Sequence, residues 1–153
     1  LPATGYRVVR RSLVVGHGGA DFAAAAAGLR DWRMLRTAGL RVRTDAPRVA
    51  VGVEFASGLG IGRLRLWAPC RVVWLVDEAT RFGFGIGTLP GHPTSGEEAF
   101  EVSLAPDGVV RFEVRAFSRL ARWYTRLGGP VTRALQSWVT GRYLRALRSV
   151  VQH

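Results

Sequence analysis

Apolar side chains recur at every second residue across the middle of this chain, between Leu40 and Phe117. The alternation is plain in four runs, which cover residues 49–55, 82–86, 100–104 and 110–116. Successive side chains of a strand point to opposite faces, so these runs predict strands with one buried face. A Pro-Asp-Gly turn at 105–108 separates the last two runs and predicts a hairpin. We therefore expect an antiparallel sheet with one face buried.

Other elements flank this region. A strand is predicted over Tyr6–Val15, followed by a helix that Asp21 caps and that runs to about Thr37, with Gly39 as its terminator. Its expected buried stripe is Phe22, Ala26, Leu29 and Trp32. A short helix over 118–127 and a helix of roughly twenty residues after Pro130 complete the chain. The long helix carries an apolar stripe of Val131, Leu135, Trp138, Tyr143, Leu147, Val150 and Val151, with Arg133, Arg145 and Arg148 on its other side.

This order of elements predicts an α+β helix-grip fold, in which a curved antiparallel sheet wraps around the long C-terminal helix. The 153 residues form a single domain, 1–153, and are enough to bury a real core. We expect a cavity between the sheet and the helix. Deep apolar pockets with a few convergent polar groups are the usual ligand sites.

The charge of the chain is strongly positive, at +11, and every basic residue is Arg. This bias is typical of a GC-rich bacterial genome. The ends of the chain are basic and residues 44–110 are acidic. An Arg-rich surface can simply be solvated, or it can attract nucleic acid or another anion. No zinc-finger or aromatic-glycine RNA motif accompanies the charge, so nucleic acid is an unfavoured partner.

Cys70 is the single cysteine and lies in an apolar run, which predicts a buried, inert thiol. A lone cysteine fits a reducing cytoplasm. No apolar run reaches 18 residues, so no membrane-spanning helix is expected. The chain begins with Leu1 rather than Met, and we expect further residues to precede it.

The best candidates for chemistry lie within residues 77–101, which hold five of the eleven acids. His92 can act as an acid or base near neutral pH, and Glu97 or Glu98 can polarise it or share that work. The alternative is structural, since the Pro-Gly-His-Pro loop is typical turn chemistry. One His without a second His or Cys nearby makes a poor metal site, so we expect no metal and no cofactor.

Three glycines, Gly83, Gly85 and Gly87, alternate along one predicted strand and allow close approach by a packed helix or a ligand. Arg81 either pairs with Asp77 across a turn or binds an anionic group at the cavity mouth. Ser118 can cap the short helix. The predicted ligand-binding residues are Arg81, Phe84, Ile86, Thr88, Ser118, Arg119, Trp123 and Tyr124.

The stretch Gly83–Pro93, with Gly-Thr-Leu-Pro-Gly-His-Pro at its end, and the following Gly96–Phe100 resemble uncharacterised protein family 0548. Segments 32–40, 69–73 and 116–119 fit the same resemblance. That family is similar to the START and Bet v 1-like helix-grip superfamily, which includes polyketide cyclases. The resemblance implies the same fold and a ligand cavity. Two positions depart from the family pattern: Ile86 replaces a common Tyr, and Leu120 a common Pro.

These observations favour a protein that binds a hydrophobic or amphipathic small molecule between the sheet and the terminal helix. The competing hypothesis is a cofactor-free enzyme, such as a cyclase, isomerase or dehydratase of secondary metabolism, that uses His92 and Glu97 or Glu98 as acid and base. The third is anion or nucleic-acid binding by the Arg-rich termini.

Overall fold

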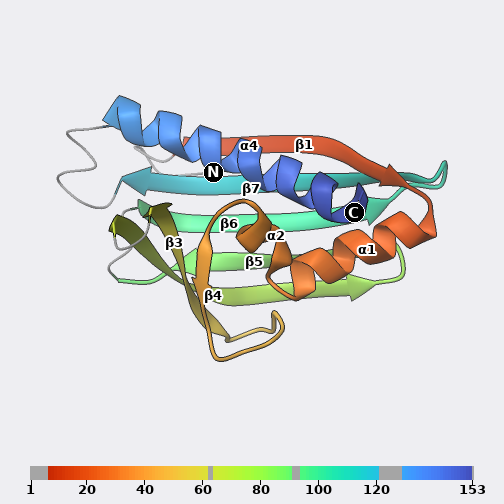
Figure 1. The fold of residues 1–153 in the computed structure, drawn as a ribbon, viewed down its shortest axis with the longest axis horizontal. Coiled ribbons are helices and arrows are strands. Elements are labelled where there is room, and N and C mark those ends of the chain that lie inside the picture. Colours follow the sequence, from red (N-terminus) through yellow and green to blue (C-terminus); the bar gives the residue numbers. More distant parts are fainter. Residues whose placement is uncertain (1–6, 62–63, 91–93, 121–128, 153) are drawn as a thin grey trace.

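A computed structural model describes residues 7–61, 64–90, 94–120 and 129–152. Seven strands form one antiparallel sheet in the order β1-β7-β6-β5-β4-β3-β2, and the helices lie against its concave face (Figure 1). This arrangement confirms the predicted helix-grip fold. The strands are β1 (Arg7–His17), β2 (Arg41–Arg43), β3 (Glu54–Ile61), β4 (Leu64–Glu78), β5 (Arg81–Thr88), β6 (Thr94–Leu104) and β7 (Val109–Leu120).

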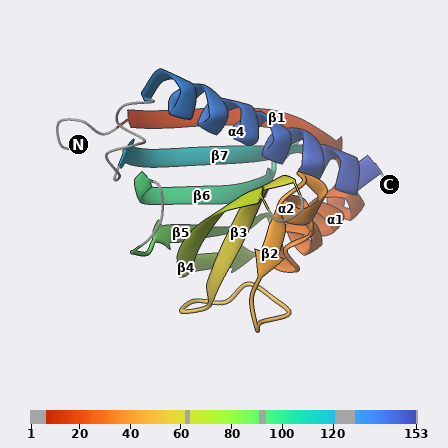
Figure 2. The same cartoon turned by 60° about the vertical axis from the view of Figure 1, so that its left-hand side comes forward.

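The long helix α4 (Gly129–Gln152) runs across the sheet, with α1 (Gly19–Arg30) and α2 (Arg33–Thr37) beside it. Figure 2 shows β2, β3 and β4 curving round toward the helices at the far side of the sheet. The core lies between the two layers. At its centre the Phe100 ring meets the Tyr143 ring edge-on, with centroids 5.4 Å apart.

The alternation predicted for β5, β6 and β7 is confirmed. Phe82, Phe84, Phe100 and Phe112 are fully buried on the concave face. The hairpin between β6 and β7 has the predicted turn, in which the Ala105 amide donates to the Val109 carbonyl at 2.9 Å. Gly108 takes a φ of 91°, which an L-residue rarely adopts.

The predicted helix from Asp21 to Thr37 is wrong in its continuity, because the chain breaks into α1 and α2 at Trp32. Trp32 has a φ of 68°, and its indole N–H donates to the Ala46 carbonyl at 2.9 Å. Its ring also packs against Phe55, with centroids 4.7 Å apart. These tertiary contacts outweigh the local helical preference. The predicted buried stripe of Phe22, Ala26, Leu29 and Trp32 is nevertheless confirmed.

Asp21 does not cap this helix, because α1 already begins at Gly19. Its carboxylate instead accepts the His17 amide at 2.8 Å. The predicted strand over 49–55 is also wrong, since β3 begins only at Glu54. Gly52, with a φ of 90°, turns the chain there and leaves Val51 63% exposed.

The predicted short helix over 118–127 is wrong for its first three residues. Strand β7 continues to Leu120, and Ser118 pairs with Arg7 of β1 and Gly96 of β6, so it caps no helix. The remainder of that segment lies outside the described residues. The stripe of α4 is confirmed at Tyr143 and Leu147, but Leu135 and Trp138 are 38% and 49% exposed. The Arg142 guanidinium lies over the Trp138 ring.

Gly85 makes room for a side chain rather than for a helix or a ligand. A Cβ at Gly85 would overlap the Trp74 indole, which comes from the neighbouring position on β4. A bulge between Val72 and Trp74 sets this register. At Gly83, a Cβ would lie 2.7 Å from the Phe100 carbonyl oxygen. The expectation that a helix packs over these glycines is therefore wrong.

We predict that Gly85→Ala lowers the free energy of unfolding by about 1–3 kcal/mol, because the indole must leave its position. Gly87→Ala is the matched control, since its added Cβ would lie 3.4 Å from Val73, close to ordinary van der Waals distance. Urea unfolding of both variants measures the difference. If Gly85→Ala and Gly87→Ala have equal stability, Trp74 is not held over Gly85.

Candidate functional site

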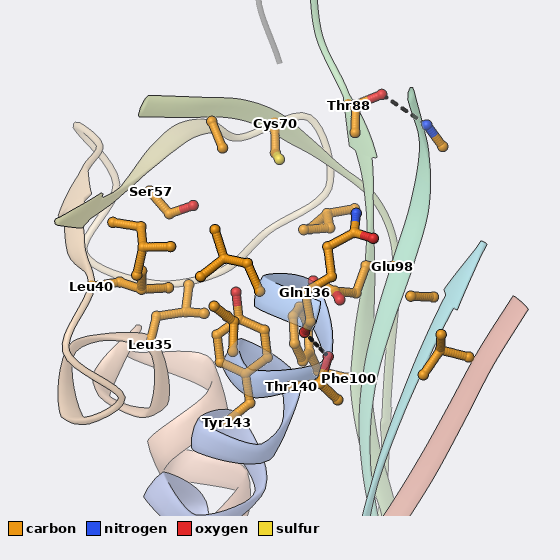
Figure 3. Close-up of a pocket in the computed structure, with 18 of the residues that line it drawn as sticks. Leu35, Leu40, Ser57, Cys70, Thr88, Glu98, Phe100, Gln136, Thr140 and Tyr143 are labelled. Atoms are coloured by element: carbon orange, nitrogen blue, oxygen red, sulfur yellow. Dashed lines mark hydrogen bonds between the residues drawn. The ribbon is translucent and has the colours of Figure 1, made fainter. Parts of the chain in front are cut away.

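A cavity of about 180 Å³ lies between the sheet and α4 (Figure 3). All the strands except β2 contribute to its wall, together with α2, the following loop and α4. The wall is mostly apolar, with a few polar groups. The lining residues that bear on its chemistry are Leu35, Leu40, Phe55, Ser57, Ala68, Cys70, Ile86, Thr88, Glu98, Phe100, Ala116, Gln136, Thr140 and Tyr143.

The alternation of side chains along the strands determines which residues form the sheet side of this wall. Ile86 of β5, Glu98 of β6 and Ala116 of β7 are direct neighbours in the antiparallel register. Their side chains therefore share the concave face. A carboxyl group thus stands between an isoleucine and an alanine, facing the helix. Next to them, the Thr88 hydroxyl accepts the Gly96 amide at 3.0 Å.

The helix side of the wall consists of Gln136, Thr140 and Tyr143, which recur at the spacing of one helical face. The Thr140 hydroxyl donates to the Gln136 carbonyl at 2.9 Å. Tyr143 is only 8% exposed, yet none of the described side chains or backbone groups hydrogen-bonds its hydroxyl. That hydroxyl points into the cavity (Figure 3).

Glu98 has neither an ion-pair partner nor a hydrogen-bond donor among the described residues. The cavity leaves its carboxyl partly accessible, but the surrounding protein removes most of its water. This burial raises the pKa of Glu98 from 4.5 to about 7. The group is therefore divided between its neutral and ionised forms near neutral pH.

Two titratable groups of the described wall, Cys70 and Tyr143, are affected by the charge of Glu98. Burial first, and the nearby Glu98 charge second, raise the pKa of the Cys70 thiol to about 12. The same two causes raise the pKa of Tyr143 well above its usual value. Both groups are neutral at physiological pH, so Cys70 is no ready nucleophile, in line with the expected buried thiol.

Four of the residues predicted from the sequence contribute to this cavity: Ile86, Thr88, Glu97 and Glu98. The Glu97 side chain is exposed, because Glu98, its neighbour on the strand, takes the inward position. His92 lies outside the described residues, as do Trp123 and Tyr124. Ser118 and Arg119 lie in β7, and the structure describes their backbone only.

The structure places the other two predicted ligand-binding residues away from the cavity. Phe84 is absent from the lining and packs against Trp32 and Phe100 in the core. Arg81 occupies an outward position and pairs with Glu101 and, at 3.9 Å, with Glu78. Glu101, first by hydrogen bonding and then by its charge, raises the pKa of Arg81.

The expected Arg81–Asp77 ion pair is also wrong. In the β4–β5 register, Glu78 is the residue opposite Arg81, and Asp77 lies opposite Phe82. Asp77 instead accepts a hydrogen bond from Arg30 of α1 at 3.0 Å.

Sequence reasoning missed the helix side of the site. Tyr143 was assigned to the core stripe, and Gln136 and Thr140 were not singled out. A signal was present, since these two polar residues share a helical face with Tyr143. Within the described part of the chain no group of three or more His, Cys, Asp or Glu could hold a metal, and no helix is long and apolar enough to cross a membrane.

Glu98 makes stability depend on pH. Because its pKa in the folded protein, about 7, exceeds the ordinary 4.5, the folded state keeps a proton that the unfolded chain loses. Its contribution is full below about pH 4.5 and is lost as the pH rises through 7. We predict that the free energy of unfolding of Glu98→Gln, relative to that of the wild type, rises by roughly 3 kcal/mol at most as the pH goes from 4.5 to 8. Urea unfolding across this pH range measures the gain, and Glu97→Gln, which changes an exposed acid, is the control. Parallel curves of unfolding free energy against pH for all three proteins would contradict the prediction.

Known sequences that are similar to this chain come from one protein family. The sequence model of a domain of unknown function, DUF1990, matches residues 1–146. A UPF0548 protein of Deinococcus radiodurans is 35% identical over 148 residues, which cover 90% of this chain and 75% of that protein. A UPF0548 protein of Arabidopsis thaliana is 29% identical over 86% of this chain and 67% of its own length.

Solved structures share the fold at low sequence identity. A hypothetical protein of Helicobacter pylori superposes with a TM-score of 0.69 at 13% identity, over 94% of this chain and 86% of that one. A point mutant of norcoclaurine synthase from Thalictrum, in complex with a transition-state analogue, has a TM-score of 0.60 at 10% identity, over 96% and 97% of the two chains. The sequence matches over nearly the whole chain, together with this shared helix-grip fold, show that the chain belongs to the UPF0548 family.

Proposed function

We propose that this protein binds a small hydrophobic or amphipathic molecule in the cavity between its sheet and α4. The observation that carries the proposal is a polar pair, Glu98 and Tyr143, inside a largely apolar wall, with no partner among the residues that the structure describes. No side-chain oxygen of the described residues is both fully buried and unpartnered, so these groups open onto the cavity, where a bound molecule can reach them. A ligand with a polar end would supply the missing contacts and fill the apolar remainder.

The volume of the cavity limits the size of this ligand. Drug-sized ligands occupy pockets of about 300–1,000 Å³, whereas apolar cavities of about 150 Å³ take up benzene. At about 180 Å³, this cavity suits a molecule of one ring or a short chain. That size favours a compact ligand over a long-chain lipid.

Binding in the cavity is tested by filling it. Ala116 lies beside Glu98 in the register, so Ala116→Leu places extra carbon in the ligand's space. We predict that a screen of one-ring compounds raises the Tm of the wild type, since a ligand at a hundred times its Kd adds about 2.7 kcal/mol of stability. Ala116→Leu should lose this ligand-dependent shift while it remains folded.

The matched control is Ala23→Leu, the same substitution at an exposed position of α1. It should keep the full ligand-dependent shift. Native mass spectrometry of the same proteins gives the stoichiometry, which should be one ligand per chain. Equal shifts in Ala116→Leu and the wild type would place binding elsewhere, and the cavity proposal would then be wrong.

A second candidate function is a cofactor-free acid–base enzyme, such as a cyclase, isomerase or dehydratase. The observation that favours it is the pKa of Glu98, about 7, because a general acid or base works best when its pKa is near the working pH. The shared fold with norcoclaurine synthase, which was crystallised with a transition-state analogue, is consistent with catalysis on such a scaffold. Participation of His92 stays a prediction from the sequence.

For a substrate identified by the ligand screen, we predict that Glu98→Gln lowers kcat by about 10²–10⁴ and changes KM much less, because it removes proton transfer but preserves shape. The wild-type pH–rate profile should contain one limb near pH 7 that Glu98→Gln lacks. His92→Ala tests the second proposed group. Full activity in Glu98→Gln would contradict a role for Glu98 as the catalytic acid or base.

Two further expectations remain proposals. Arg10 and Arg115, which belong to the two basic parts of the chain, both pair with Glu113. Anion or nucleic-acid binding by the Arg-rich termini is the least supported of the three hypotheses. We also propose a cytoplasmic location, which the single buried Cys70 favours.

A further inference from the structure

We propose that the molecule held in this cavity carries a cationic amine, which pairs with the Glu98 carboxylate and hydrogen-bonds the Tyr143 hydroxyl. This inference rests on the proposed function and names the class of its ligand. It concerns the charge of the polar end, which the size and apolar character of the cavity leave open.

The first reason is the missing partner of Glu98. The chain has 22 arginines, and most of its other strand carboxylates use them: Glu101 pairs with Arg81 and Arg115, Glu113 with Arg10, and Glu54 with Arg71. Glu97 has no such pair among the described residues, but its side chain is exposed to water. Glu98 alone among the described glutamates of β6 turns inward, and it has no cation. A buried carboxylate without a partner is costly, and a ligand cation would supply one.

The second reason is the chemistry of the wall. No Arg or His is among the described residues that line the cavity, so no cationic side chain there would pair with an anionic ligand. Oxygen atoms that accept hydrogen bonds lie instead on Glu98, Tyr143 and Ser57. An ammonium group donates three hydrogen bonds and accepts none, and it therefore complements such a wall.

The third reason is the aromatic surface beside these acceptors. The rings of Phe55, Phe100 and Tyr143 all line the cavity. Ring faces attract cations, the more so when the site is dry. Glu98 extends from the sheet wall and Tyr143 from the helix wall, so an amine between them meets a carboxylate and aromatic rings together (Figure 3).

This arrangement also predicts how binding depends on pH. Among the described residues of the wall, the other titratable groups are Cys70 from β4, Tyr143 from α4 and Glu97, whose side chain takes the outward position on β6. The described lining residues of β1, β3, β5, β7 and α2 are uncharged. Cys70 and Tyr143 are neutral below pH 8, since the pKa of each is raised. Ionisation of Glu98 is therefore the step that controls amine binding between pH 5 and 8.

Three probes of nearly equal size test the inference: benzylamine, benzyl alcohol and toluene. Isothermal calorimetry at pH 8 should show that the wild type binds benzylamine at least tenfold more tightly than benzyl alcohol. The affinity for benzylamine should fall as the pH is lowered to 5, because Glu98 becomes protonated while the amine stays charged. The affinity for toluene should not change with pH.

Glu98→Gln should abolish the preference for benzylamine and its pH dependence, while toluene still binds. Glu97→Gln removes the adjacent but exposed acid and should keep both properties. Tyr143→Phe should weaken benzylamine more than toluene. Carbon-13 NMR of the wild type gives a readout that needs no variant: benzylamine should lower the pKa of the Glu98 carboxyl.

The outcomes separate this inference from the proposed function. If toluene and benzyl alcohol bind and benzylamine binds no more tightly, the amine inference is overturned while cavity binding stands. If Ala116→Leu and the wild type behave alike toward all three probes, or if none of them binds, cavity binding fails and the amine inference fails with it. A benzylamine preference that persists in Glu98→Gln also overturns the inference.

Discussion

The packing of Tyr143 on Phe100 is the contact on which the rest of the structure depends. The two rings meet edge-on, 5.4 Å between centroids, where α4 crosses the middle of the sheet. From this point Tyr143 and Leu147 continue into a closed core, whereas Thr140 and Gln136 face the cavity. The contact thus divides the space between sheet and helix into a packed half and a hollow half. The candidate site lies along that boundary.

The electrostatics of the site follow from its place in the sheet. Away from the cavity, Glu101 of β6 and Glu113 of β7 pair with arginines. The pKa of Glu101 is lowered, because Arg81 hydrogen-bonds it and, with Arg115, adds positive charge. Three residues earlier on the same strand, Glu98 faces the cavity and its pKa is raised to about 7. The strand period decides which acid of β6 faces the cavity and which acids point away from it.

The sequence predicts those parts of the fold whose burial has a local period. Alternation predicted β5, β6 and β7, and the apolar stripe predicted α4, because one face of each element is buried along its length. The break at Trp32 could not be predicted, since it depends on the Ala46 carbonyl and the Phe55 ring, which are distant in sequence. The same holds for Gly85, whose neighbour Trp74 takes its position from a bulge in β4.

The site was predictable only in part. The alternation of Phe100, Val102 and Leu104, extended back by two residues, places Glu98 rather than Glu97 on the buried face. On the helix side, Gln136 and Thr140 mark a polar face that includes Tyr143, but the sequence does not reveal how far the helix stands from the sheet.

The most direct measurement is a crystal structure of the protein grown with saturating benzylamine. The account predicts density for one ring inside the cavity, with its nitrogen within about 3 Å of a Glu98 carboxylate oxygen. A core with no cavity, or a ligand bound outside the space between the sheet and α4, would contradict it.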